Sequence, residues 1–405
     1  MTTEKNQGTQ SFKALARKKE TVTKKDQGTR ADSALSFSGF APISRRAFSI
    51  GLGAAGLATL GLGVPKVRAA STVTFLGWQG YETPMSSGGY LEKNDITLQT
   101  TYIANTEDII AKLKAGGIGT IDLATPNIAY VPLLTKMKLL APIDVSMIPN
   151  YAHVMPFFAD QELLSHEGKQ YAVPFTWGTQ PLMYRPDLVT EVPTSWLDVL
   201  KPEYKGKVVM TGSHVGNIQV WGKVVTGAEV PSWLTPAQLK ETIDFLIKIK
   251  KEHALTYTDS YGEMADIFAR GEAVISTMGW EPVASWVAKK GVELAYTYPK
   301  EGTTGFIDTY VIPKNAPNYE LDHGLINNAL STAAQVVIAE DSGQGIVNTT
   351  AIEKLSPDAK KAYPYDDMDT LVERAKFYPF PPIEDDGVHA TYDMIIREWE
   401  RFLRS

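Results

Sequence analysis

Aromatic residues and single carboxylates recur in this 405-residue chain at places where short apolar runs end. The positions are Trp78 and Tyr81, Asn127, Trp280 and Glu281, and Asp308. The faces of Trp and Tyr rings attract ammonium groups by cation–π contacts worth roughly 0.5–2 kcal/mol. A carboxylate in a desolvated cleft adds a charge-assisted hydrogen bond. Together these residue types predict a binding site for an amine, although either Trp alone is also compatible with a place in a core.

The residues of familiar catalytic and metal sites lack the spacing that such sites need. The histidines are scattered and form no H-x-x-x-H pair, so we expect no zinc site; they are His153, His166, His214, His253, His323 and His389. Neither a G-x-S-x-G motif nor a P-loop is present. The chain contains no cysteine, which excludes disulfides, thiolate catalysis and iron–sulfur clusters. We therefore expect no catalytic residue, no metal and no cofactor.

The elements expected to carry the candidate residues alternate between strands and helices. In the first half, strands are expected at 73–76, 96–103 and 122–125, and helices at 105–114 and 127–138. In the second half, strands are expected at 207–211, 273–278 and 294–299, and helices at 236–252, 261–270 and 392–403. This alternation predicts a mostly parallel α/β sheet, whose ligands bind beyond the carboxyl ends of the strands. Residues 77–81 and 126–127 fall at two such ends.

One stretch, residues 171–208, is interpreted as the connection between two lobes. Its sequence is YAVPFTWGTQPLMYRPDLVTEVPTSWLDVLKPEYKGKV. Pro174 lacks a backbone donor, and Gly178 permits unusual dihedral angles. We therefore expect a chain that passes between lobes here, and not a central sheet strand.

The pattern YxVPxxWGT…LxYRPD…SWLDVLKPEYKGKV in this stretch resembles the periplasmic solute-binding proteins of ABC importers, in particular the spermidine/putrescine-binding family. The resemblance implies an α/β, two-lobed periplasmic-binding-protein fold of type II, whose lobes are joined by two or three hinge crossings. Lobe one is expected to comprise 72–176 plus 304–345, and lobe two 177–303 plus 346–405. It also implies lobes that close around a solute by hinge motion.

The resemblance suggests roles for residues at the loop ends of lobe one. In the polyamine-binding family a Trp-x-x-Tyr motif follows the first strand, and it matches Trp78 and Tyr81, with Gln79 where a Thr is frequent. A Ser follows the D-L-x-x-P strand of the family, and here that position is Asn127. A tyrosine that is usual just after it is replaced by Ala129. These four matching positions, 78, 79, 81 and 127, are the expected ligand-binding residues of lobe one.

Further roles fall on lobe two and on the return crossing. The family has a Trp at the end of the strand after its G-E-V/A run, which matches Trp280. Its Trp-x-Asp motif after K-E-G reads F-I-D here and ends at Asp308; because the Asp of that motif holds a ligand amine, Asp308 is the strongest single candidate. Two acids that hold another amine group in the family are absent from 211–217. Glu281 is expected either to compensate for them or to be an unrelated helix cap.

The missing acids leave the class of ligand open. A smaller or monovalent amine, or another amine-bearing solute, is compatible with the remaining residues. A binding protein for an anionic or zwitterionic solute would instead need a cation in the cleft, for which Arg185 and Lys300 are the candidates. An extracytoplasmic enzyme or sensor on the same fold is the alternative from another class of protein.

The N-terminal region has the composition of an export signal preceded by a polar leader. Residues 1–43 are polar and are expected to be disordered. Residues 44–70 contain an S-R-R-x-F core with Arg45 and Arg46, a weakly apolar run of about fifteen residues and a small-residue cleavage site after Ala69, an arrangement that resembles a twin-arginine signal. The apolar run is shorter than the roughly twenty residues of a membrane span, so an anchor is the less favoured alternative.

Removal of the signal makes the remaining chain strongly acidic. Residues 1–70 hold 12 of the 40 Lys+Arg and 4 of the 46 Asp+Glu, which leaves 28 against 42 and a net charge of −14. An acidic protein is a poor partner for nucleic acid or anionic membrane surfaces. The expected partners are a small-molecule ligand, with an amine favoured, and an ABC permease in the inner membrane. We expect an exported, periplasmic monomer.

Overall fold

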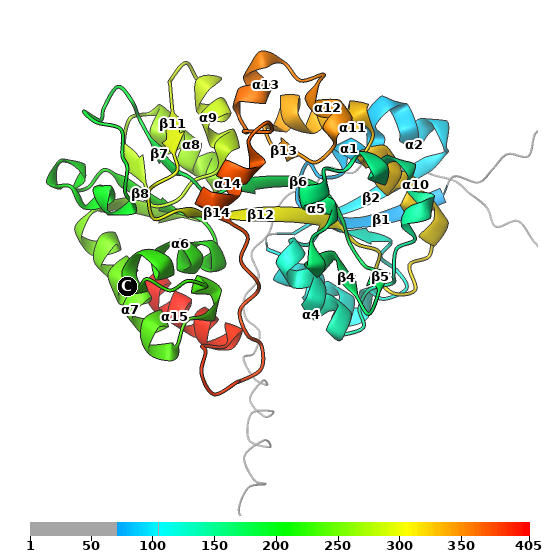
Figure 1. The fold of residues 1–405 in the computed structure, drawn as a ribbon, viewed down its shortest axis with the longest axis horizontal. Helices are drawn as coiled ribbons and strands as arrows, with labels where there is room; N and C mark the ends of the chain where they lie inside the picture. The colour runs from blue at the N-terminus through cyan, green and yellow to red at the C-terminus, as the bar shows by residue number, and fades with distance from the viewer. Residues whose placement is uncertain (1–70, 104) are drawn as a thin grey trace, which may run out of the picture. The chain divides into compact units, whose positions relative to one another are not determined.

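The computed structural model describes residues 71–103 and 105–405, and within them the chain forms a two-lobed α/β fold (Figure 1). The expected leader and signal, with Arg45 and Arg46, lie outside the described residues. Across the described ranges, no helix combines the length and the apolar character that crossing a membrane requires.

Lobe one is built on a three-stranded parallel sheet with the order β2-β1-β3. Its strands are β1 (Ser71–Gly77), β2 (Ile96–Tyr102) and β3 (Leu123–Ala124). Its helices are α1 (Thr83–Ser86), α2 (Tyr90–Lys93), α3 (Glu107–Lys112), α4 (Val131–Lys136), α5 (Pro156–Ala159), α10 (Tyr319–Ala329) and α11 (Thr332–Val337). Because β1 and β3 are parallel neighbours, the loops that follow them emerge at the same edge of the sheet.

Lobe two is built on a five-stranded sheet with the order β11-β7-β10-β8-β9. Its strands are β7 (Leu182–Tyr184), β8 (Val208–Thr211), β9 (Ala254–Thr258), β10 (Ile275–Ser276) and β11 (Ala295–Thr297). Its helices are α6 (His214–Thr226), α7 (Pro236–Glu252), α8 (Tyr261–Ala269), α9 (Glu281–Ala288) and α15 (Tyr392–Arg404). Strands β9, β8 and β10 are parallel, so α8, α6 and α9 all begin at one edge of this sheet.

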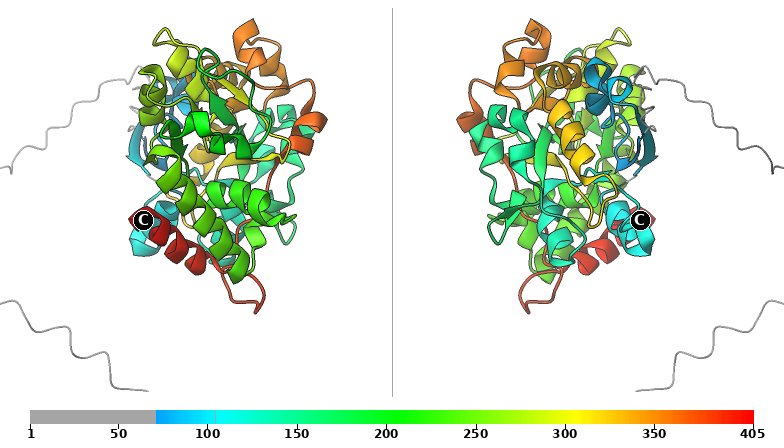
Figure 2. Two further views of the ribbon diagram at one scale, coloured as in Figure 1. Left: turned by 90° about the vertical axis from the view of Figure 1, so that its left-hand side faces the viewer. Right: turned by 90° about the vertical axis from the view of Figure 1, so that its right-hand side faces the viewer.

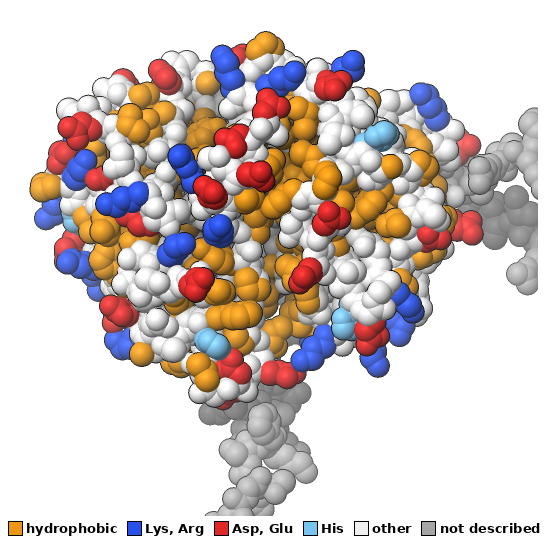
Figure 3. Space-filling model, viewed as in Figure 1, with side chains coloured by type: hydrophobic (Ala, Val, Ile, Leu, Met, Phe, Trp, Pro, Cys, Tyr) orange, Lys and Arg blue, Asp and Glu red, His pale blue; other side chains and the backbone are white. Residues whose placement is uncertain are grey.

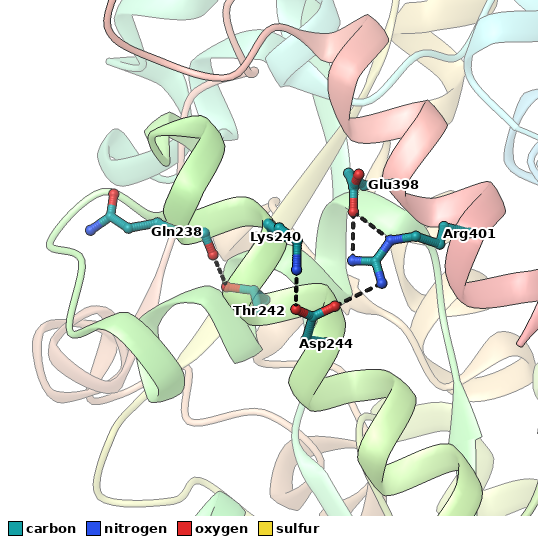
Figure 4. A network of polar contacts seen from close by, with 6 residues as sticks. All are labelled: Gln238, Lys240, Thr242, Asp244, Glu398 and Arg401. Carbon is teal, nitrogen blue, oxygen red and sulfur yellow. Dashed lines mark hydrogen bonds and ion pairs between the residues drawn. The ribbon is translucent and has the colours of Figure 1, made fainter.

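The C-terminal helix α15 belongs to lobe two and packs along α7 (Figure 2). Trp399 and Phe402 of α15 are buried in the lobe-two core. At the surface, Arg401 joins Glu398 of its own helix and Asp244 of α7, with 2.7 Å between Arg401 Nη1 and Asp244 Oδ1 (Figure 4). Exposed ion pairs contribute at most about 1 kcal/mol each, so the apolar contacts provide most of the attachment.

The lobes are connected by an antiparallel ribbon of β6 (Val173–Thr179) and β12 (Thr303–Tyr310), which runs between them in Figure 1. Two short strands, β13 (Gly345–Ile346) and β14 (Ala375–Lys376), extend it to the order β13-β6-β12-β14. Strand β6 is therefore a central strand, and the expectation that Pro174 would prevent this is wrong. The register shifts between Asp308 and Thr309, next to the pair Thr309–Pro174, and β13 pairs only with Thr176 and Trp177. Pro174 therefore lies beside an irregularity in its pairing with β12 and, among the described residues, has no strand partner on the side of β13.

Buried side chains divide the chain between the two lobes. The core of lobe one takes residues from 73–177 and 307–375, whereas the cores of lobe two take residues from 182–294 and 390–402. The chain therefore crosses three times, and the third crossing is 376–389. The segment 346–375 packs on lobe one, which differs from the expected boundary, because β13 pairs with β6 and the Tyr363 ring lies 4.9 Å from that of Trp177.

The third crossing places aromatic rings against both lobes. Phe377 lies 5.4 Å from Phe157 of lobe one, and Phe380 lies between Tyr130 of lobe one at 4.3 Å and Tyr392 of lobe two at 4.9 Å, all measured between ring centroids. The space-filling view shows hydrophobic side chains gathered along the middle of this face, among scattered charged ones (Figure 3). Contacts of this kind hold the two lobes close together.

Candidate ligand-binding cleft

The carboxylate of Asp308, on the crossing strand β12, joins two of the residues expected from lobe one. Its Oδ2 accepts a hydrogen bond of 2.6 Å from the Tyr81 hydroxyl, and its Oδ1 accepts one of 3.4 Å from Asn127 Nδ2. Tyr81 follows β1 and Asn127 follows β3, and the backbones of Asn127 and Asp308 form an isolated β-bridge. The parallel pairing of β1 and β3 therefore positions both partners of Asp308.

Tyr81 is held firmly in this arrangement. Its ring packs edge-on against Phe175 of β6, with 5.0 Å between the centroids. Its backbone carbonyl accepts a 2.9 Å hydrogen bond from the hydroxyl of Tyr310 on β12. Both ribbon strands thus fix the tyrosine whose hydroxyl orients Asp308.

The charge of Asp308 is not compensated by a protein cation. The side chain is 6% exposed, and among the described residues no Lys, Arg or His forms an ion pair with it. Burial raises the pKa of Asp308 from 3.8 to about 6, although the hydrogen bonds from Tyr81 and Asn127 act to lower it. A buried carboxylate without a counter-charge is costly unless it is protonated or gains a cationic partner. An ammonium group is such a partner.

Trp280 approaches the same face of the ribbon from lobe two. Phe306 precedes Asp308 by two residues on β12, so their side chains lie on one face, and the Phe306 ring centroid is 6.3 Å from that of Trp280. Gly178 pairs with Phe306 across the ribbon. A Cβ at Gly178 would lie 2.7 Å from the Phe306 ring and 3.1 Å from Trp280 Nε1, so a residue without a side chain is needed there.

Trp78 and Gln79 belong to the loop after β1, and among the described residues neither forms a hydrogen bond with Asp308. Trp78 is half-buried and packs against the core of lobe one, while Gln79 is exposed. The void beside Tyr81 has a volume of about 10 Å³, at the limit of what holds one water molecule, and Asp308 does not line it. Because Asp308 is itself buried, a ligand reaches its carboxylate only if neighbouring groups move.

Glu281, the first residue of α9, does not share a partner with Asp308. Its carboxylate accepts hydrogen bonds from the backbone N–H of Thr179 at 3.0 Å, from the Thr179 hydroxyl and from the Tyr298 hydroxyl at 3.3 Å. Burial raises the pKa of Glu281 from 4.5 to about 7. Of the two expectations for this residue, the contacts favour a structural one: Glu281 attaches the start of α9 to the hinge strand β6.

A cavity of about 600 Å³ opens on the side of Tyr298 and does not include Asp308. Tyr296 and Tyr298 of lobe two line it, together with residues 352–353 and 360–367 of lobe one. Cavity size alone would place a ligand here, but the uncompensated and hydrogen-bonded carboxylate of Asp308 is the stronger indication of a binding site. We therefore centre the candidate site on Asp308.

The cations considered for an anionic ligand lie elsewhere. Arg185 is 8% exposed, donates to Asp187 through Nε at 2.8 Å and Nη2 at 2.6 Å, and donates to the Phe268 carbonyl through Nη1 at 2.6 Å. Lys300 is exposed in the turn before β12. Neither residue contacts Asp308 or its partners among the described residues.

The structure also shows a contact between the lobes that the sequence patterns did not predict. Glu107 of α3 accepts hydrogen bonds from the Tyr130 hydroxyl at 2.6 Å and from the Tyr392 hydroxyl of α15. The Tyr392 hydroxyl also lies 2.9 Å from Nε2 of His214, which opens α6 and is 3.7 Å from the Glu107 carboxylate. Burial lowers the pKa of His214, and the charge of Glu107 opposes this. We call Glu107, Tyr130, His214 and Tyr392 the interlobe latch.

The sequence of this chain is similar to those of known solute-binding proteins. The family model described as bacterial extracellular solute-binding protein matches residues 89–382. The spermidine/putrescine-binding periplasmic protein of Escherichia coli is 28% identical over 323 residues, covering 78% of this chain and 90% of that protein. The putrescine-binding periplasmic protein SpuD of Pseudomonas aeruginosa is 24% identical over 328 residues, covering 74% and 88%.

Solved structures share the fold. The substrate-binding protein PotD of a spermidine/putrescine ABC transporter from Streptococcus pneumoniae superimposes with a TM-score of 0.67 at 24% identity, covering 82% of this chain and 99% of that one. The TpPotD lipoprotein of Treponema pallidum gives 0.62 at 18% identity, covering 82% and 98%. With two lobes, three crossings and a family match over most of its described length, this chain belongs to the bacterial extracellular solute-binding proteins.

Proposed function

We propose that this protein is the extracytoplasmic substrate-binding component of an ABC importer and captures a small amine-bearing, polyamine-like solute between its lobes. The observation that carries the proposal is the buried carboxylate of Asp308, which Tyr81 and Asn127 orient and which no protein cation neutralises among the described residues. A ligand ammonium provides the missing charge and hydrogen-bond donors at a site shielded from water.

The remaining candidates take places around this anchor. Trp280 from lobe two and Phe306 from the ribbon provide ring surface, and Trp78 provides it from lobe one. We propose Gln79, which is exposed in the same loop as Trp78, as a further polar contact for the ligand. Cation–π and apolar contacts of this kind suit an alkylammonium chain. We assign Glu281 to the support of α9, because its carboxylate is already occupied by Thr179 and Tyr298.

The names of the relatives support the class of ligand and the setting. The two relatives described above are named as binders of spermidine and putrescine or of putrescine, and both names place them in the periplasm. We propose that this chain likewise works in the periplasm. We further propose that it acts as a monomer and delivers its solute to an ABC permease in the inner membrane. Arg45 and Arg46 support export through the twin-arginine route. No catalytic step is part of this role.

Binding calorimetry with putrescine and spermidine tests the proposal, with butane-1,4-diol as an amine-free control. The amines are expected to bind and to raise the melting temperature by mass action, while the diol does neither. Asp308→Asn should weaken binding by at least about 100-fold. Asp322→Asn, which also neutralises a buried carboxylate but in α10, is the matched control and should retain it. An amine affinity that Asp308→Asn leaves unchanged would refute the assignment of the anchor.

A further inference from the structure

Uncharged side chains with polar atoms lie next to strand ends of lobe two. Tyr261 opens α8 after β9, Trp280 follows β10, and Gln180 lies between β6 and β7. The centroids of the Tyr261 and Trp280 rings are 5.6 Å apart. Burial raises the pKa of Tyr261, and the nearby side chain of Gln180 acts to lower it. The three residues therefore form one cluster, which we call the neutral pole.

Two buried polar atoms of the neutral pole lack a hydrogen-bond partner among the described residues. They are the indole Nε1 of Trp280, which only donates, and the amide Oε1 of Gln180, which only accepts. Leaving such a group unpaired in a buried place is costly, so native proteins normally satisfy it. A bound group that both donates and accepts hydrogen bonds would satisfy these two atoms.

Gln180 occupies space that a side chain from α6 would otherwise fill. A Cβ at Gly216, in the first turn of α6, would overlap Gln180 Oε1. The glycine thus allows the amide group to lie against the helix, beside Tyr261. This close approach places an uncharged amide on the wall of lobe two.

The neutral pole is linked to Asp308 through Phe306. Phe306 is two residues from Asp308 on β12, about 7 Å along the strand, and its ring centroid is 6.3 Å from that of Trp280. The Phe306 ring thus offers apolar surface to an alkyl chain between the carboxylate and the neutral pole. The two ends of the cleft are therefore a carboxylate at one end and an uncharged donor–acceptor pair at the other.

We propose, on the basis of the amine-binding function above, that the natural ligand carries a single ammonium group, held by Asp308, and a neutral group at its other end that both donates and accepts hydrogen bonds, such as a hydroxyl or a carboxamide. Gln180 Oε1 accepts from this group and Trp280 Nε1 donates to it. A second ammonium in that place would leave the Trp280 donor unpaired and bring a charge next to it without a counter-charge, which is unfavourable.

Glu281 is the alternative to consider, because its carboxylate could pair with a second ammonium group. It adjoins Trp280 in sequence. Burial is the larger cause of the raised pKa of Tyr261, and the charge of Glu281 raises that pKa further. Its carboxylate accepts from Thr179 and Tyr298, however, and is 3% exposed. If Glu281 received a second ammonium, its removal would change the selectivity of the protein, whereas the neutral pole predicts no such change.

Calorimetry of the purified protein against a matched ligand series tests the proposal. The series has one chain length and four ends: butane-1,4-diamine, 4-aminobutan-1-ol, 4-aminobutanamide and n-butylamine. We expect the amino alcohol or the amino amide to bind at least tenfold more tightly than the diamine and the monoamine. Preference for the diamine would overturn the proposal, and its loss in Glu281→Gln would identify Glu281 as the second anchor.

Two variants at the neutral pole separate its contributions. Gln180→Glu should reverse the preference towards the diamine by about tenfold or more. Trp280→Phe keeps a ring but removes the donor, and should weaken the amino alcohol and amino amide by a larger factor than n-butylamine. Unchanged ratios in both variants would refute the neutral pole. Failure of every amine to bind would instead refute the proposed function, so the two failures are distinguishable.

Discussion

The carboxylate of Glu107 in lobe one accepts a hydrogen bond from the hydroxyl of Tyr392 in lobe two. Tyr392, on helix α15, follows Glu107 by 285 residues in the chain. The Tyr392 hydroxyl also lies 2.9 Å from Nε2 of His214. The latch thus joins the two lobes directly through side chains, at a place separate from the connecting ribbon of β6 and β12. Contacts of this kind exist only when the lobes are close, so they contribute to closure and thereby to affinity.

Removal of the latch should weaken ligand binding without touching the ligand. A hydrogen bond to a charged group contributes about 1.5–3 kcal/mol, so Tyr392→Phe is expected to raise the dissociation constant of a bound amine by about tenfold or more. Tyr130→Phe is the matched control, because it removes a hydrogen bond to the same Glu107 carboxylate from within lobe one. Calorimetry measures both, and equal losses in the two variants would contradict a role in closure.

Neutralisation of Asp308 should separate binding from stability. Asp308→Asn is expected to weaken amine binding by at least about 100-fold, since it removes the charge that pairs with the ammonium. The free protein at pH 7.5 should become more stable, on the order of 1–3 kcal/mol, because the raised pKa shows that ionised Asp308 is unfavourable in the fold. Urea unfolding with and without ligand tests both statements, and a less stable free protein would contradict the second.

Affinity for an amine should depend on pH through Asp308. In the free protein its pKa is about 6, so below that pH a proton competes with the ligand ammonium for the carboxylate. The association constant is therefore expected to be constant above pH 7 and to fall below pH 6, approaching about tenfold per pH unit. Glu281→Gln should leave this profile unchanged. A break that lies near pH 7 and disappears in that variant would assign the titration to Glu281.

A buried acid away from the cleft offers a test of stability alone. Asp322 of α10 is fully buried, both of its carboxylate oxygens lack a partner among the described residues, and its pKa is raised to about 8, first by burial and then by the charge of Asp122. A raised carboxyl pKa means that the folded state binds the proton more tightly, so this group makes the protein less stable as pH rises from about 4 to 8.

Asp322→Asn should therefore raise the melting temperature at pH 8 by at least about 2 °C and have a smaller effect at pH 5. Differential scanning calorimetry at the two pH values makes the comparison. An equal increase at both would mean that packing, and not charge, is responsible.

Gly178→Ala should destabilise the ribbon where the two lobes meet. The added methyl group would lie 2.7 Å from the Phe306 ring, and overpacking of this kind costs about 1–3 kcal/mol. Gly262→Ala in α8 is a control, because its Cβ meets nothing nearer than Ser260 Oγ at 3.6 Å, and it should stabilise the helix by up to about 1 kcal/mol. Urea unfolding of both variants gives the difference, and a neutral Gly178→Ala would mean that Phe306 moves freely.

The sequence predicts the two-lobed fold well because its signals are local. Alternating strands and helices indicate an α/β sheet, and the crossover motif identifies the family, which the family match confirms. The central position of β6 was not predictable, because its neighbour β13 comes almost 170 residues later in the chain. For the same reason the attachment of 346–375 to lobe one became visible only in the structure.

The candidate site was predictable where it follows strand ends and hidden where it depends on side-chain direction. Tyr81, Asn127 and Asp308 meet because two of them follow parallel neighbouring strands. Glu281 is adjacent to Trp280 in sequence, but the start of α9 turns its carboxylate towards Thr179. Gln180 carries no motif, and its place depends on the room that Gly216 leaves.

The three crossings also determine when each half of the molecule is able to assemble during synthesis. Lobe one includes buried residues up to Ala375, and lobe two includes Trp399 and Phe402 near the C-terminus. A core that lacks these segments leaves apolar surface exposed, so each lobe is complete only after distant parts of the chain have been made and have paired. Long-range pairing of this kind is intrinsically slow.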